Sequence, residues 1–118
     1  MATIEVLGTA QDAGVPHVGC GCRNCTAVRE GSTPTRYVSS ILLRDGGEFV
    51  FDATPDLRFQ LSSVPDGFFL THDHLGHLPG VLYFGPEAAD TDRLPVYCTE
   101  ALATVLGNNA PFSLLVDR

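Results

Sequence analysis

The stretch that decides the fold is Thr71-His72-Asp73-His74-Leu75-Gly76-His77, which holds three of the chain's four histidines. It follows the apolar run 67–70, and an apolar run that stops at a polar cluster is typical of a buried strand that delivers side chains to the end of a sheet. Side chains alternate along an extended backbone, so His72 and His74 are expected to point the same way. Imidazole is the commonest metal ligand. The stretch therefore predicts a metal site, with a chance cluster of surface histidines as the alternative.

Length and composition favour one globular domain. The chain has 118 residues, 44% of them apolar, and a net charge of −7. A nucleic-acid partner would need a basic face, which this charge excludes. A membrane-spanning segment needs about 20 apolar residues in a row, and neither such a run nor a secretory signal is present. We expect a cytoplasmic protein, in which the four cysteines are metal ligands or free thiols rather than disulfides.

Hydrophobic patterning and turn residues predict alternating strands and helices. The strands are expected over residues 3–7, 37–43, 48–51, 68–71, 95–98 and 112–116, and the helices over 23–29, 54–63, 78–89 and 100–106. The turn Asp45-Gly46-Gly47 indicates a hairpin between two of these strands. This order predicts an α/β (α+β) layered fold, in which helices flank a mixed sheet.

A second cluster consists of Cys20, Cys22 and Cys25, separated by few residues and by glycines. Three thiols at this spacing can converge on one zinc ion, because glycine lets the backbone turn tightly around the metal. The fourth ligand would be His17, Cys98 or a residue outside the chain. Redox-active or simply buried thiols are the alternative.

Asp52 ends the predicted strand 48–51, at the place where sites of α/β proteins gather. Its carboxylate is predicted either to orient a ligating histidine or to accept hydrogen bonds from backbone amides of the next turn. The sequence leaves these two roles open.

These motifs together resemble a known family. Residues 71–77 resemble the His-x-His-x-Asp-His signature of the metallo-β-lactamase superfamily. Taken with the segments 7–16, 20–25, 39–41 and 55–58, they are similar to the family of B proteins of pyrroloquinoline quinone (PQQ) biosynthesis. The resemblance extends from Leu7 to about Tyr97.

The resemblance implies the first half of an αββα sandwich, with residues 1–118 as the N-terminal part of a single domain. It implies that His72, His74 and His77 hold one metal, zinc or iron, with His77 at the last position of the signature. The aspartate of the signature is replaced by Gly76, as in the PQQ subgroup. His72, His74, His77 and Asp52 are thus the expected catalytic residues. The fourth ligand of the three-cysteine zinc site is implied to lie beyond Arg118.

The activity implied is an oxidative tailoring or transport step on a small or short peptide-derived substrate in PQQ biosynthesis. The alternatives are a metal-dependent hydrolase of phosphodiesters or esters, and a metal-binding fragment without turnover. Strands 37–43 and 48–51 are apolar on both faces, as in sheets that are covered on both sides. The chain is therefore expected to be part of a longer protein, or to pair with a second copy.

Overall fold

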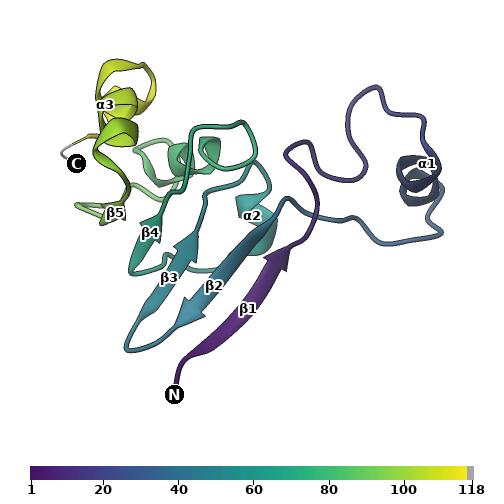
Figure 1. The fold of residues 1–118 in the computed structure, drawn as a ribbon, viewed down its shortest axis with the longest axis horizontal. Helices are drawn as coiled ribbons and strands as arrows, with labels where there is room; N and C mark the ends of the chain where they lie inside the picture. Colours follow the sequence, from purple (N-terminus) through teal and green to yellow (C-terminus); the bar gives the residue numbers. More distant parts are fainter. Residues whose placement is uncertain (117–118) are drawn as a thin grey trace.

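The computed structural model describes residues 1–116 and contains one five-stranded mixed sheet (Figure 1). The strands, in spatial as in sequence order, are β1 (Thr3–Gly8), β2 (Ser40–Arg44), β3 (Glu48–Phe51), β4 (Gly67–Phe69) and β5 (Val96–Tyr97). The first three are antiparallel neighbours, whereas β3, β4 and β5 run parallel. The predicted α+β fold with a mixed sheet is confirmed.

The helices expected over 23–29 and 100–106 are present, whereas those expected over 54–63 and 78–89 are shorter than the sequence suggested. The helical segments are α1 (Arg23–Arg29), α2 (Leu57–Gln60), α3 (Glu100–Asn108) and two 3₁₀ segments, η1 (Pro79–Phe84) and η2 (Phe112–Leu114). The helix expected over 78–89 is the 3₁₀ segment η1, which has proline at its start and ends before Pro86. The strand expected over 112–116 is wrong. Its amides close tight turns on residues three or four positions earlier, and Phe112 packs on the core instead of joining the sheet.

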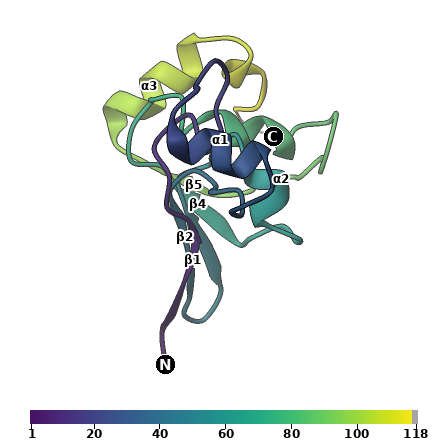
Figure 2. The same ribbon diagram turned by 90° about the vertical axis from the view of Figure 1, so that its right-hand side faces the viewer.

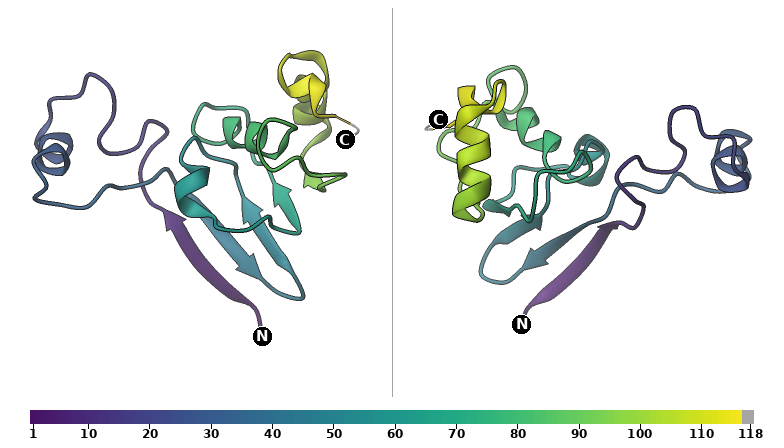
Figure 3. Two further views of the ribbon diagram at one scale, coloured as in Figure 1. Left: turned by 180° about the vertical axis from the view of Figure 1, so that it is seen from behind. Right: turned by 45° about the horizontal axis from the view of Figure 1, so that its top comes forward.

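One face of the sheet carries the core. Leu42, Val50 and Phe68 are buried side by side on neighbouring strands, because alternate residues of each strand face the same side. Leu57 of α2 and Leu78 before η1 belong to the same cluster. Seen from behind, α2 lies in front of the sheet and η1 lies beyond the ends of β3 and β4 (Figure 3, left).

The opposite face of the sheet is apolar and carries no helix (Figure 1). An aromatic ladder crosses it: Phe69 stacks on Phe51 at 4.9 Å and on Tyr97 at 4.8 Å between ring centroids. On the outer strand β1, Ile4 and Val6 are 64% and 61% exposed. Both faces of the strands are thus apolar, as the sequence predicted.

We expect the 118-residue chain to self-associate through this face, because soluble monomers rarely expose large contiguous apolar patches. Val6→Lys places a charge on the patch. It should weaken association at least about tenfold, because the free energy of burying one valine side chain corresponds to at least that factor. Sedimentation velocity measures this. Val18→Lys is the matched control, since Val18 is 98% exposed in the loop before α1. A monodisperse monomer at all concentrations would contradict the expectation.

The strand directions gather three loops at one edge of the sheet. Because β1 and β3 are both antiparallel to β2, and β4 is parallel to β3, the carboxyl ends of β1, β3 and β4 share an edge. The loop after β1 also carries α1, which stands apart from the sheet in a lobe of its own (Figure 1) and is nearest the viewer in Figure 2. Among the described residues, no helix is long and apolar enough to cross a bilayer.

Candidate metal centres

The three signature histidines lie together at the carboxyl edge of the sheet. The imidazole of His72 is 4.6 Å from that of His74 and 4.1 Å from that of His77, measured between ring centroids. The turn is closed by the backbone N–H of His77, which donates to the carbonyl of His74 at 3.0 Å. The structure therefore places the ring of His72 against both other rings, and their role as metal ligands remains a prediction.

Asp52 holds two of these histidines in position. Its Oδ2 lies 2.8 Å from Nδ1 of His77, and its Oδ1 accepts the backbone N–H of Thr71 at 2.8 Å. The hydroxyl of Thr71 contacts both Asp52 oxygens and lies 2.8 Å from Nδ1 of His72. Of the two roles left open, the structure supports orientation of a histidine. The backbone amide that Asp52 binds is that of Thr71, not one of the next turn.

This network places a proton on Nδ1 of both rings. An ionised carboxylate only accepts hydrogen bonds, so the Thr71 hydroxyl donates to Asp52 and Nδ1 of His72 donates to the hydroxyl. Nδ1 of His77 donates directly to Asp52 in the same way. Each ring then presents Nε2, which is the arrangement that a carboxylate–histidine–metal triad requires. Although Asp52, His72 and His77 have potential ligand atoms within 4.8 Å of one another, the oxygens of Asp52 are occupied by these bonds. It is a positioning residue.

Asp52 is held in a strained backbone conformation at the end of β3. Its φ is +68°, a left-handed value that aspartate and asparagine tolerate better than most residues. The residue is buried, with 8% of its surface exposed. Its own backbone N–H donates to the carbonyl oxygen of Phe69 in β4 at 2.8 Å. The strained residue therefore links the two parallel strands next to the histidines.

Asp12 joins this centre, although the sequence analysis did not single it out. Its Oδ1 lies 3.0 Å from Nε2 of His77. Partial burial opposes ionisation, but the backbone N–H of Gly76 and the nearby His77 and His74 together lower the pKa of Asp12. The only signal in the sequence was the position of Asp12 after the first strand, and nothing local revealed that this loop meets the turn at 74–77.

The cysteine cluster forms a second centre in the α1 lobe. Ligand atoms of His17, Cys20 and Cys25 all lie within 4.8 Å of one another. Cys25 is buried, and Nδ1 of His17 is buried without a hydrogen-bond partner. A buried polar atom without a partner is costly, so this nitrogen fits a metal ligand. Among the fourth ligands considered, the structure places His17 at the cluster, whereas Cys98 packs beside the core.

Cys22 lies beside this group rather than inside it. Its Sγ accepts the backbone N–H of Cys25 at 3.4 Å and so caps the start of α1. That amide, with smaller contributions from the thiols of Cys20 and Cys25, lowers the pKa of Cys22 to about 7. A thiol with such a pKa readily supplies a thiolate, which is the form that binds metal. All four cysteines are free thiols, as expected.

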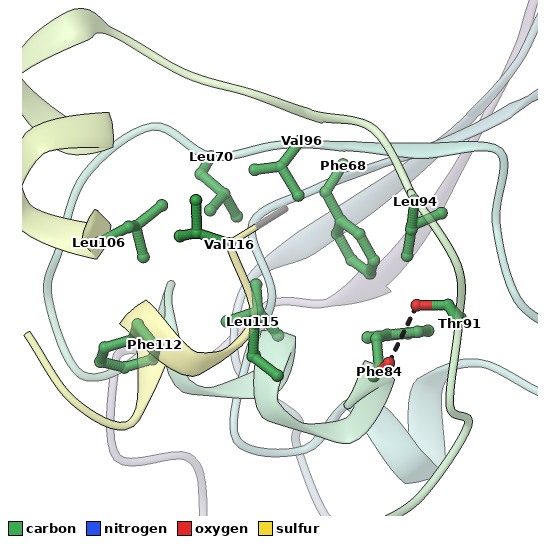
Figure 4. A pocket seen from close by; sticks show the side chains of 11 residues that line it. Phe68, Leu70, Phe84, Thr91, Leu94, Val96, Leu106, Phe112, Leu115 and Val116 are labelled. Atoms are coloured by element: carbon green, nitrogen blue, oxygen red, sulfur yellow. Dashed lines mark hydrogen bonds between the residues drawn. The ribbon is translucent and has the colours of Figure 1, made fainter. Parts of the chain in front are cut away.

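An apolar cavity lies elsewhere, and none of its lining side chains is a metal ligand. It has a volume of about 240 Å³ and is enclosed by β4, η1, α3 and η2 (Figure 4). Its one polar side chain, Thr91, donates its hydroxyl hydrogen to the carbonyl of Phe84 at 2.9 Å. Its lining is Phe68, Leu70, Val81, Phe84, Thr91, Leu94, Val96, Leu106, Phe112, Leu115 and Val116.

Comparison with known sequences points to one group of proteins. No family model matches the chain. Proteins named Coenzyme PQQ synthesis protein B match it across most of its length. The one from Stutzerimonas stutzeri is 34% identical and the one from Rhizobium meliloti 31%, each over 95% of this chain and 41% of the relative. A third, from Pseudomonas paraeruginosa, is 44% identical over 66 residues. The chain thus spans about two fifths of the length of these relatives.

Comparison with solved structures supports the same fold. Zn²⁺-bound PqqB from Methylobacterium extorquens superposes with a TM-score of 0.82 at 23% identity, over 98% of this chain and 43% of PqqB. A diphosphatase of the PhnP family superposes with a TM-score of 0.75 at 28% identity, over 98% of this chain and 48% of the diphosphatase. The five-stranded sheet is therefore the metallo-β-lactamase-type fold that these two proteins share.

Proposed function

We propose that this chain, a homologue of Coenzyme PQQ synthesis protein B over most of its length, is the N-terminal part of a metal-dependent protein that acts in PQQ biosynthesis. Residues 1–118 would then be part of a single metallo-β-lactamase-fold domain. The observation that carries the proposal is the gathering of His72, His74 and His77 at one sheet edge, with a buried carboxylate fixing His77.

The donor set suits a divalent metal. One imidazole in contact with two others matches the preference of zinc and iron for imidazole nitrogens. A metal bound there would supply Lewis acidity, or redox chemistry with dioxygen if it were iron. Asp52 orients the ring of His77 directly and the ring of His72 through the hydroxyl of Thr71. The substrate would be a small molecule or a short peptide-derived precursor that reaches this open edge.

The cysteine lobe is proposed as a structural zinc site. Cys20 and Cys25 with His17 supply three converging ligands, and the Cys22 thiol lies next to them. A closed tetrahedral set of three cysteines and one histidine is a common structural zinc site. Arg29 braces the loop, because its guanidinium donates to the carbonyls of His17 and Cys20.

Restoring PQQ production tests the proposed function. A bacterial strain that lacks its PQQ synthesis protein B should regain PQQ when its own gene carries residues 1–116 of this chain in place of the matching segment. The same chimera with His72→Ala and His74→Ala should produce none. PQQ is measured by reconstitution of a quinoprotein dehydrogenase. Equal PQQ production by the chimera and its histidine variant would refute a functional role for the cluster.

A phosphodiesterase is the second candidate, because the PhnP-family diphosphatase shares the fold. Hydrolysis of bis(p-nitrophenyl) phosphate by the metal-loaded protein, lost in the same histidine variant, would favour it over the first. Metal binding without either activity would indicate a metal-binding module.

The net charge of −7 supports the absence of a nucleic-acid partner, and we propose a cytoplasmic location without membrane attachment.

A further inference from the structure

We propose that Asp12 is a ligand of the metal that His77 binds, so that the loop after β1 completes the histidine centre. This inference rests on the proposed metal site and adds a ligand to it. Asp12 is 65 residues from His77 in sequence, and the two side chains meet because β1 and β4 end at the same edge of the sheet.

The distance between the two side chains fits a shared ion. Oδ1 of Asp12 lies 3.0 Å from Nε2 of His77. Two ligand atoms bound to one ion at about 2.0–2.1 Å lie about 3 Å apart when the angle at the metal is near 90°. Nδ1 of His77 is already engaged by Asp52 at 2.8 Å, which leaves Nε2 as the ligating nitrogen. The ion would be held between a carboxylate oxygen and an oriented imidazole.

The loop that carries Asp12 packs directly against Gly76 in the turn between His74 and His77. A Cβ at position 76 would lie 2.6 Å from Cα and 2.7 Å from Oδ1 of Asp12. The closer atom is backbone, so a side chain at this position would have to displace the whole loop. Gly76 is buried, and its lack of a side chain is what lets the carboxylate approach His77.

The alternative is that Asp12 only forms a hydrogen bond with His77. The two roles predict opposite effects of removing the carboxylate. If Asp12 is a ligand, its loss removes a metal–oxygen bond and weakens binding. If it is only a hydrogen-bond partner, it competes with the metal for Nε2, so its loss leaves affinity unchanged or raises it. The sign of the change therefore separates the two roles.

Mn²⁺ is the probe, because it favours carboxylate over thiolate ligands and should avoid the cysteine centre. Free Mn²⁺ is followed by electron paramagnetic resonance during titration of the chain. We expect one ion per chain, at least tenfold weaker binding by Asp12→Asn, and a similar loss for Gly76→Ala, which changes no ligand atom. Asp73→Asn, an exposed aspartate of the same turn, and Gly107→Ala, at a glycine with nothing within 4 Å of an added Cβ, should bind as the unmodified chain does.

Each result decides between the proposals. Unchanged or tighter binding by Asp12→Asn would overturn the ligand role while leaving the histidine site intact. If the unmodified chain bound no Mn²⁺, the metal site itself would fall and the role of Asp12 with it. Thermal unfolding of each variant shows whether it is folded, and Asp12→Asn alone decides the question if Gly76→Ala fails to fold.

Discussion

Replacing Asp52 by alanine is expected to destabilise the protein by about 1–3 kcal/mol, the cost of leaving partly buried hydrogen-bonding groups without a partner. The variant would deprive the N–H of Thr71, its hydroxyl and Nδ1 of His77 of their acceptor. It would also place alanine at a φ of +68°, which aspartate tolerates better. Urea unfolding measures the change in free energy. A loss below about 0.5 kcal/mol, the range of ordinary surface substitutions, would contradict this role.

Asp52→Asn separates stability from metal binding. Asparagine tolerates the left-handed backbone and keeps an oxygen for Thr71, so stability should fall much less than with alanine. Its amide group would then face Nδ1 of His77 as a donor, which forces the imidazole to carry its proton on Nε2. The affinity for Mn²⁺ should therefore drop about 10–100-fold, as for other partners of metal-binding histidines. An asparagine variant that binds Mn²⁺ normally would show that Asp52 does not set the tautomer.

Local sequence signals sufficed for the histidine cluster. The alternation of His72 and His74 and the turn at His77 follow from strand geometry and from a polar stretch that interrupts an apolar run. The predicted strand 48–51 likewise placed Asp52 at this edge of the sheet. In each case the residues that meet are close in the chain or lie at adjacent strand ends, so that periodicity contains the information.

Contacts between distant loops left no such signal. Asp12 reaches His77 because the end of β1 turns toward the loop after β4, a consequence of strand order that no local pattern carries. The segment 112–116 was mistaken for a strand because an apolar run of that length fits a strand or a packed helical turn equally well. Pro111 at the start of the segment and the contact of Phe112 with the core favour the helical turn over a strand.

The cysteine lobe shows where a metal would replace a hydrophobic core. Helix α1 has seven residues and buries only Cys25, whereas isolated helices shorter than about 12–15 residues are marginal in water. Its first turn is capped by Cys22, and its loop is held by Arg29. With so little apolar burial, we propose that ligands converging on one ion order this lobe, so that metal binding is coupled to its local folding.

The purified chain is therefore expected to hold one zinc ion at the cysteine centre, which Cys25→Ala and Cys22→Ala should lose and His17→Ala should bind at least tenfold more weakly. Structural zinc sites supply about 10–16 kcal/mol of apparent binding free energy in zinc-finger peptides, so loss of the ion should leave α1 unprotected in hydrogen exchange. Elemental analysis gives the zinc content. Cys98→Ala is the matched control, since Cys98 packs beside the core. Full zinc content in Cys22→Ala would show that this thiol only caps α1, and full affinity in His17→Ala would mean that its buried nitrogen is not a ligand.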